Sequence, residues 1–279
     1  MRSKAKYNQG VALIVVLMIT AVMAVIMLYM TGQGQNNARL AGILKKNTDA
    51  QLNIESAQAE LIYSYITTSF SILGPREDFQ GQPSVNVFTD NLANETKELE
   101  DYNVSVQDIS GLVSLVPFNK SDFNRLLINN GVGQDELFKI SDRLDDWQDQ
   151  DGLKHLEGAE RGDYNMPYLP KNGVIQKSKE LIYILENEEL YNKIKPYITL
   201  YASDYIVRQF MPKSLYSALG ISEQDAQDTS AEGVSYPSGR FLVKITSNHD
   251  VSITKQFILL RGQNSISPYS ITDEELIFR

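Results

Sequence analysis

Residues Val11 to Met30 read VALIVVLMITAVMAVIMLYM and form one uninterrupted apolar segment. The segment contains no charged residue and no proline, and its only side-chain hydroxyls belong to Thr20 and Tyr29. A helix of this length is roughly 30 Å long, which matches the hydrocarbon core of a bilayer. A single segment satisfies its backbone hydrogen bonds in lipid only as a helix. We therefore expect one membrane-spanning helix.

The ten residues before this segment, MRSKAKYNQG, carry Arg2, Lys4 and Lys6 and no acidic residue. A basic start followed by an apolar run is also typical of secretory signal peptides. Signal peptides, however, have a shorter apolar core and a small-x-small cleavage site after it, whereas here TGQGQNN follows the segment. The basic flank places the N-terminus in the cytoplasm, so the chain from about Gly32 onward lies on the other side of the membrane.

Composition narrows the classes of function. A chain of 279 residues is long enough for a sizeable core and one or two domains. Its net charge is −9, and without the three basic residues of the leader 23 basic residues face 35 acidic ones, a net charge of −12. Such a balance argues against a nucleic-acid partner. The sequence has no cysteine, which excludes disulfides and cysteine-based zinc sites, so a core or another metal must stabilise the domain.

A small residue, Gly10, stands directly before the first apolar residue. This junction resembles the signal of type IV pilins and type II secretion pseudopilins, in which a prepilin peptidase cuts after the glycine. The resemblance implies cleavage between Gly10 and Val11, with a methylated N-terminus on the mature chain. An uncleaved signal anchor with an incidental glycine is the alternative.

The fifth residue after this junction is Val15, where most pilins and pseudopilins carry a glutamate. A carboxylate in the bilayer costs about 2.5 to 3.5 kcal/mol on insertion scales, so families that keep one use it. A chain without it resembles the K-type minor pseudopilin of type II secretion, which lacks that glutamate and caps the filament.

Helical periodicity continues from Arg39 to Leu73, and Gly74-Pro75 is expected to end the helix. The apolar positions of its outer half are Ile54, Ala57, Leu61, Ile62, Tyr65 and Ile66. This stripe needs a sheet to cover it, and the helix over about 35–73 is also expected to bind partner subunits. Leu61→Asp or Tyr65→Asp is therefore expected to weaken either the core or the complex.

Strand patterns occur on both sides of a helical region. Residues 76–99 are polar and indicate a loop, whereas 101–106 and 111–116 predict strands, and 240–246 with 252–260 predict a hairpin. We expect an α+β pseudopilin fold, with a long N-terminal transmembrane helix packed on an antiparallel sheet that a large all-α insert interrupts. The predicted parts are a leader 1–10, a helix 11–73, a discontinuous sheet domain 74–116 and 233–279, and an inserted helical domain 117–232.

Within the helical region, Ser121 is expected to cap a helix over FNRLLINN, and a second helix is expected from Gln134 to Trp147. An ordered series of motifs follows that matches the K-type family at compatible spacing. The series is Asp146-Trp-Gln-Asp-Gln-Asp151, Gly158-Ala-Glu160, Tyr164, Pro167-Tyr168 with Asn172, Glu180-Leu181 and Lys195-Pro-Tyr197. The resemblance covers roughly residues 10–201, with 240–261 as closing strands, whereas 202–232 match poorly. An earlier family motif, Asp-x-x-Gly-x-x-Asn-Leu-Asn, matches residues 108–116 only in part.

The acidic run after the second helix is not an EF-hand. With Gly152 at position six of the loop, Trp147 stands at position one and Gly158 at position twelve, where carboxylates are required. A hard cation also binds to several carboxylates from one loop of another kind. The K-type resemblance implies calcium sites in this region, with Asp149, Asp151, Glu160 and Asp163 as candidate ligands and Asp146 as a further one.

Two simpler interpretations of this region remain open. The acidic run is alternatively a solvated loop, and His155 is expected to be a surface histidine. Trp147 is expected in the core or as a lid on the loop. An enzyme would use two of the carboxylates as acid and base, but no nucleophile triad or phosphate-binding glycine loop stands out.

The whole pattern is identified as that of the K-type minor pseudopilin family. The resemblance implies a structural, non-enzymatic protein of the bacterial inner membrane, single-pass, with its C-terminal bulk in the periplasm at the tip of a pseudopilus. The implied partners are the I and J minor pseudopilins, the prepilin peptidase and the inner-membrane assembly platform, with calcium as cofactor. A minor pilin of a type IV pilus is the alternative, and a membrane-anchored hydrolase is a more distant one.

Cleavage at the glycine makes the first prediction. Because the basic leader, the small residue and the apolar run coincide, the mature chain is expected to start at Val11. N-terminal sequencing of the membrane-bound form tests this. A start at Met1 in cells with active peptidase, or a start after residue 30, contradicts it.

Overall fold

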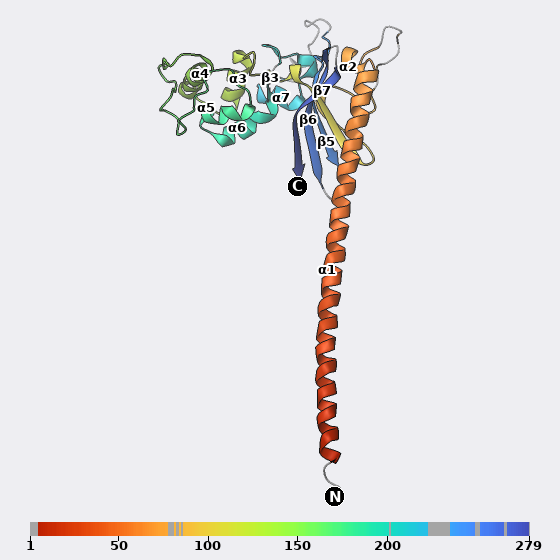
Figure 1. Cartoon of the computed structure of the whole chain (residues 1–279). Helices are drawn as coiled ribbons and strands as arrows, with labels where there is room; N and C mark the ends of the chain where they lie inside the picture. Colours follow the sequence, from red (N-terminus) through yellow and green to blue (C-terminus); the bar gives the residue numbers. More distant parts are fainter. Residues whose placement is uncertain are drawn as a thin grey trace.

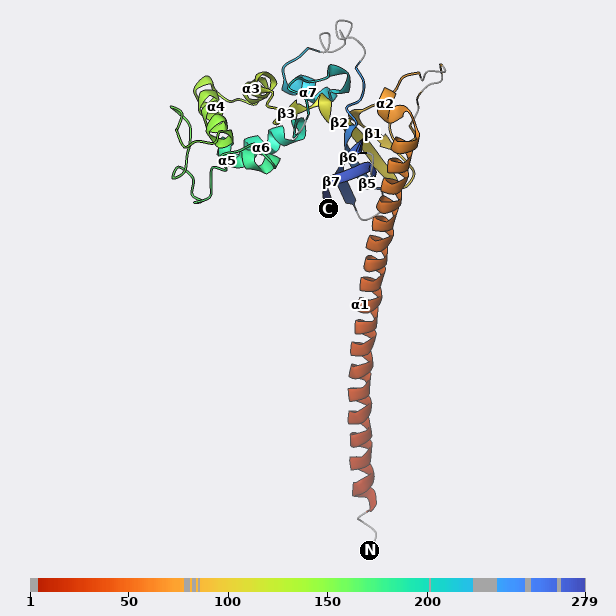
Figure 2. The ribbon, with the colours of Figure 1, turned by 45° about the horizontal axis from the view of Figure 1, so that its top comes forward.

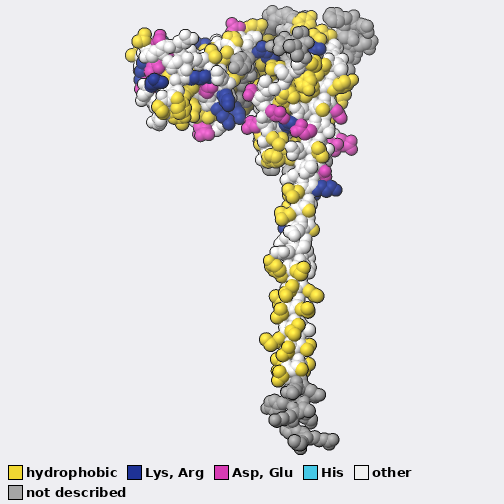
Figure 3. Space-filling model, in the orientation of Figure 1, with side chains coloured by type: hydrophobic (Ala, Val, Ile, Leu, Met, Phe, Trp, Pro, Cys, Tyr) yellow, Lys and Arg dark blue, Asp and Glu magenta, His cyan; other side chains and the backbone are white. Residues whose placement is uncertain are grey.

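A long helix organises the computed structural model, which describes residues 5–77, 81, 84, 86–200, 202–222, 235–248, 252–264 and 267–278. The first four leader residues and the predicted boundary at 232–233 lie outside the described residues. Helix α1 (Ala5–Thr67) forms a stalk that carries the rest of the chain at the end away from the N-terminus (Figure 1). Over Val11–Thr67 it is long and apolar enough to cross a membrane, and the rest of the chain buries none of its most apolar part. Apolar side chains line its lower half (Figure 3).

The outer end of the helix is closed by a glycine, as predicted. A short helix α2 (Phe70–Leu73) follows α1 and ends at Gly74, whose φ of 73° is left-handed. Glycine adopts this conformation without the steric penalty of a Cβ atom. The chain therefore turns back at this point toward the sheet.

Five antiparallel strands form the main sheet in the order β1-β2-β5-β6-β7. Strand β2 pairs with β5, and Val106 lies opposite Val243, although more than a hundred residues separate the two strands in sequence. The predicted hairpin is present as β5 and β6. The α+β class with a helical insert is thus confirmed. The strands are β1 (Ala93–Glu98), β2 (Tyr102–Asp108), β5 (Arg240–Ser247), β6 (Ile253–Asn264) and β7 (Ser267–Phe278).

The first core lies between α1 and this sheet. Alternate residues of β5 point inward because side chains of a strand alternate between faces, and Phe241 packs edge-on against Tyr65 at 5.0 Å between ring centroids. Leu61 and Tyr65 are fully buried in this core. Of the two expected effects of an aspartate at these positions, the structure supports loss of the core, and neither residue belongs to an exposed interface. The helix side of this core consists of Ala50, Ile54, Ala57, Leu61, Ile62 and Tyr65.

The insert has a second core of its own and lies beside the sheet, on the side away from α1 (Figure 2). Its first helix is capped by the side chain of Asn119, which accepts from the backbone N–H of Asp122, and not by Ser121 as predicted. Trp147 lies in this core, as expected, and is 1% exposed. The helices are α3 (Lys120–Asn129), α4 (Gln134–Gln148), α5 (Leu181–Leu185), α6 (Glu188–Ile194) and α7 (Lys213–Ala218).

Three strand predictions need correction. Strand β1 occupies part of the stretch predicted as loop, and β7 extends the sheet beyond the predicted hairpin. The predicted strand at 111–116 does not join the main sheet. Instead β3 (Val113–Ser114) pairs in parallel with β4 (Ile198–Thr199) inside the insert.

The chain leaves the main sheet at a corner between Asp108 and Gly111. The buried Asp108 carboxylate accepts from the backbone N–H of Ser110 at 2.9 Å and from that of Ser238 at 2.7 Å. It thereby joins the segment that enters the insert to the segment that returns from it. A Cβ atom on Gly111 would lie 2.0 Å from the carbonyl oxygen of Phe210, so only glycine fits there. This packing gives a physical reason for the Asp-x-x-Gly part of the family motif.

The close packing at Gly111 leads to the second prediction. Gly111→Ala is expected to lower the melting temperature by several degrees, because overpacking typically costs about 1 to 3 kcal/mol. Gly133→Ala is the matched control, since its Cβ atom would meet nothing within 4 Å. Thermal unfolding of both variants, followed by circular dichroism in detergent, measures the difference. Equal melting temperatures for the two variants contradict the assigned packing.

Candidate functional site

The predicted cleavage junction lies within α1. Gly10 and Val11 are consecutive residues of the continuous helix, and Val11 is exposed. Val15, at the position of the usual glutamate, is exposed as well. Cleavage at this junction remains a prediction.

The predicted metal region begins at the C-terminal end of α4. Asp145 and Asp146 occupy its last turn, Asp149 is its C-cap, and no basic residue lies in that turn. A helix C-terminus carries a partial negative charge, which favours cations and disfavours carboxylates. Lys120 pairs with the exposed Asp145 at 3.6 Å. The repulsion of Asp146 and Asp149 from the helix dipole and from each other favours further positive charge.

Two of these acids converge with a histidine. Asp146, Asp149 and His155 each offer an atom that could bind a metal ion, and these atoms all lie within 4.8 Å of one another. Asp146 is fully buried, and its Oδ1 accepts a hydrogen bond from the backbone N–H of His155 at 3.1 Å. The same oxygen also forms a hydrogen bond with the ring Nδ1 of His155. This hydrogen bond raises the pKa of His155. His155 lies at the surface, as predicted, but its spacing in the sequence did not predict that it joins the cluster.

Three buried carboxylate oxygens in this region have no hydrogen-bond partner within the described part of the chain. They are Oδ2 of Asp146, Oδ1 of Asp149 and Oε1 of Glu160. Burial raises the pKa of Glu160, and the charges of Asp146 and Asp149 raise it further. Burial likewise raises the pKa of Asp149, with Asp151 and Asp146 adding to the effect. Unpaired buried carboxylate oxygens are costly, and a bound cation would satisfy them.

The other two predicted ligands contact different groups in this structure. Oδ1 of Asp151 accepts from the backbone N–H of Leu153 at 2.8 Å, and the residue is exposed. Asp163 accepts from the backbone N–H of Glu160 and pairs with Lys154 at 3.0 Å, and both contacts lower its pKa. Lys154 is therefore engaged by Asp163 and does not neutralise the cluster.

The Gly-Ala-Glu motif places Glu160 near enough to the cluster that, besides burial, the charges of Asp146 and Asp149 raise its pKa. A Cβ atom on Gly158 would lie 1.9 Å from Oδ2 of Asp146, so the backbone reaches the carboxylate only because residue 158 is glycine. Ala159 is buried next to it. Trp147 fixes the other side, since its ring nitrogen donates to Glu180 at 3.2 Å and its ring stacks on Tyr183. The motifs that match the K-type family thus connect the end of α4 with the loop that follows it.

The arrangement fits a bound metal ion. Asp146 and Asp149 supply carboxylate oxygens close enough together to bind one ion, and such oxygens suit a hard cation. Glu160 lies outside this group of three, and its charge acts on the group from nearby. His155 would supply a nitrogen, which suits zinc or another transition metal. Since Nδ1 of His155 already bonds to Asp146, the ring is placed to orient that carboxylate.

Comparisons with known proteins agree with the sequence resemblance. Residues 98–203 match the family model of the Type II secretion system (T2SS), protein K, and the predicted K-type resemblance is confirmed over this segment. The matched family is structural rather than catalytic. No curated protein matches the sequence of this chain.

A solved structure shares the fold. A chain of the crystal structure of the GspK-GspI-GspJ complex from the enterotoxigenic Escherichia coli Type 2 Secretion System is similar with a TM-score of 0.56. The sequence identity is 13%, and the match covers 84% of this chain and 97% of that one. The similarity therefore includes the sheet and the insert together.

Proposed function

We propose that this chain is a K-type minor pseudopilin that caps the periplasmic pseudopilus of a type II secretion system. It is cleaved after Gly10, held in the bacterial inner membrane by residues 11–30, and has its bulk in the periplasm. In this role it supports assembly of the pseudopilus and export of folded proteins. The observation that carries the proposal is the family match over residues 98–203, the stretch that runs from the sheet into the insert.

The shape of the molecule supports a place at the filament tip. The insert extends sideways from the sheet while α1 extends straight down (Figures 1 and 2). Subunits stacked along their stalks leave room for such a projection only at an end. Val15 adds to this, because it offers no carboxylate to pair with the N-terminal amine of an adjacent subunit. A minor pilin of a type IV pilus is the second candidate.

The surface that would contact partner subunits lies on α1, on the N-terminal side of the core that α1 forms with the sheet. Leu40, Ile43 and Leu44 are all exposed there, between the apolar segment and the part that the sheet covers, which begins at Ala50. Contiguous exposed apolar side chains on a helix typically mark an interface. The similar solved protein is in complex with GspI and GspJ. We assign this surface to the corresponding I and J subunits.

The assignment makes the third prediction. Leu40→Asp with Leu44→Asp is expected to weaken co-purification with the I and J pseudopilins of the same system by on the order of tenfold or more, because charges replace apolar contacts. Phe138→Asp is the control, since Phe138 is equally exposed but lies in the insert. Both variants should keep the melting temperature of the wild type. Unchanged co-purification of the double variant, or binding to pilus subunits instead, contradicts the proposal.

The cation in the α4 cluster is proposed to be calcium. The carboxylates of Asp146 and Asp149 match its preference for oxygen ligands, and Glu160 lies nearby. Calcium would neutralise the repulsion at the end of α4 and stabilise the loop that follows. With no cysteine in the chain, a metal is the available substitute for a disulfide in this long irregular segment.

Calcium binding makes the fourth prediction. Millimolar calcium, compared with chelator, is expected to raise the melting temperature of the full chain by several degrees, since saturation at about a hundred times Kd contributes about 2.7 kcal/mol. Asp149→Asn with Glu160→Gln is expected to lose this rise, whereas the exposed control Asp204→Asn keeps it. A rise with zinc alone contradicts the choice of calcium. Equal melting temperatures with chelator and calcium leave the cluster as a solvated acidic loop.

A further inference from the structure

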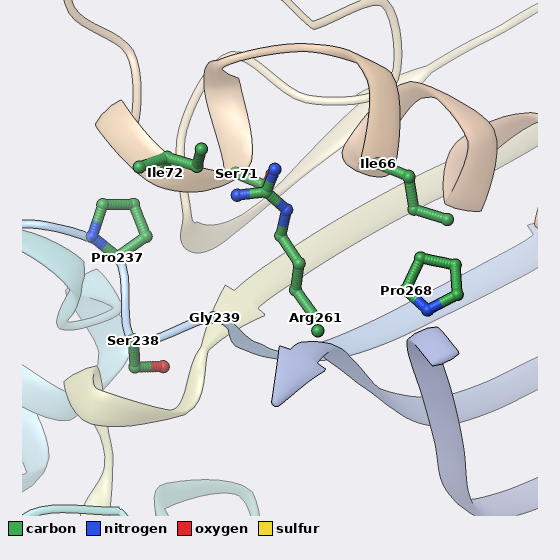
Figure 4. Close-up of a pocket in the computed structure, with 9 residues that line it drawn as sticks. Ile66, Ser71, Ile72, Pro237, Ser238, Gly239, Arg261 and Pro268 are labelled. Atoms are coloured by element: carbon green, nitrogen blue, oxygen red, sulfur yellow. The ribbon is translucent and has the colours of Figure 1, made fainter. Parts of the chain in front are cut away.

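A second candidate site lies at the opposite end of the molecule from the N-terminus. A pocket of about 340 Å³ opens where the α1–α2 turn meets the start of β5 and the end of β6. Figure 4 shows Arg261 projecting from β6 into this space, toward Ser71, with Ile66, Ile72, Pro237 and Pro268 around it. None of the metal cluster or the exposed α1 surface takes part in this pocket.

Arg261 has no partner among the residues that the structure describes. Its backbone N–H donates to the carbonyl oxygen of Gly239 at 2.8 Å, but no hydrogen bond or ion pair engages its guanidinium. The side chain is half-buried, and this burial lowers its pKa. A partly buried guanidinium carries five donors and loses part of its hydration, so it gains from a bound anion.

The residues that line the pocket restrict which kinds of anion fit it. The hydroxyl of Ser71 donates to the carbonyl oxygen of Tyr65 at 2.5 Å, and that of Ser238 donates to the carbonyl oxygen of Arg240. Neither proton is available to a ligand, so Arg261 supplies the charge and the donors. Two isoleucines and two prolines add apolar side chains to a lining that also includes Ser71, Ser238 and Arg261. A ligand that fits has a carboxylate for the bidentate contact and an apolar stem for the walls.

We propose that this pocket binds a carboxylate of a polypeptide, namely the C-terminal carboxylate with the apolar side chain of the last residue. A free phosphate would use the guanidinium but leave the apolar walls uncovered, whereas a peptide end uses both. The direction of approach rests on the proposed function. In a tip subunit the pocket faces away from the inner membrane, toward exported proteins and the outer-membrane channel.

Peptide binding to the full chain in detergent micelles tests the proposal. The probes are N-acetylated tetrapeptides with each type of C-terminal residue, prepared once with a free carboxylate and once as the amide, and inorganic phosphate. Peptides with free carboxylates and apolar last residues are expected to bind, and their amides to bind on the order of tenfold more weakly. Arg261→Gln is expected to cause the same loss, while Arg125→Gln, an exposed arginine of α3, keeps binding.

A second variant tests the pocket independently, in case Arg261→Gln does not fold. Ile72 is half-exposed beside Arg261, so Ile72→Glu places a carboxylate in the pocket of a chain that still folds. It is expected to abolish peptide binding and to raise the melting temperature. The proposal is overturned if amides bind as well as free carboxylates, if phosphate binds more tightly than every peptide, or if no peptide binds. Co-purification of Arg261→Gln with I and J is expected to be unchanged, which separates a failed pocket from a failed functional assignment.

Discussion

The packing of the outer half of α1 on the antiparallel sheet is the contact on which the rest of the molecule depends. Each large apolar side chain buried there contributes about 1.5 to 3 kcal/mol, and a buried charge network adds to the fit. Lys255 of β6 is only 4% exposed along its side chain and pairs with Glu55 of α1 at 2.7 Å and with Glu274 of β7 at 2.6 Å. Loss of either glutamate would leave a buried charge incompletely paired. One lysine of β6 thus links the stalk and the edge strand β7.

Strands β2 and β5 come directly before and after the insert and pair with each other in the sheet. The chain therefore leaves the sheet and returns to it at the same corner. Asp108 binds the backbone on both sides of the excursion, and Gly111 allows the returning chain to pass at contact distance. The insert then builds its own core without altering the stalk or the sheet. A bulky lateral domain and a straight anchored stalk therefore coexist in one chain. That combination is consistent with the proposed place at the end of the filament.

Sequence patterns predicted the elements with strong periodicity and missed those without it. The apolar run predicted α1, and alternation predicted the β5–β6 hairpin. Strand β1, ANETKE, is an edge strand with mostly exposed side chains, so no apolar alternation marks it. Strand β7 is the other edge, with Asp273, Glu274 and Glu275 in its middle, as edges that avoid aggregation often have. The apolar run at 111–116 was misassigned because a short buried run does not reveal which strand it joins.

The candidate metal site shows the same limit. The motif series named the acidic loop, but spacing alone could not show which carboxylates converge. Asp146 enters the cluster because α4 turns it inward beside Trp147, and His155 enters because its backbone N–H reaches the same carboxylate. Asp163 is instead held by Lys154. The signal available in sequence was Gly158, whose lack of a side chain brings the loop against Asp146.

The central claim is that this chain ends the filament, and the position of the insert tests it most directly. An epitope placed at the exposed residue Leu156 of the insert loop can be labelled with gold on isolated pseudopili and located by electron microscopy. The account predicts label at one end of each filament and none along its length. Label distributed along the filaments would contradict it.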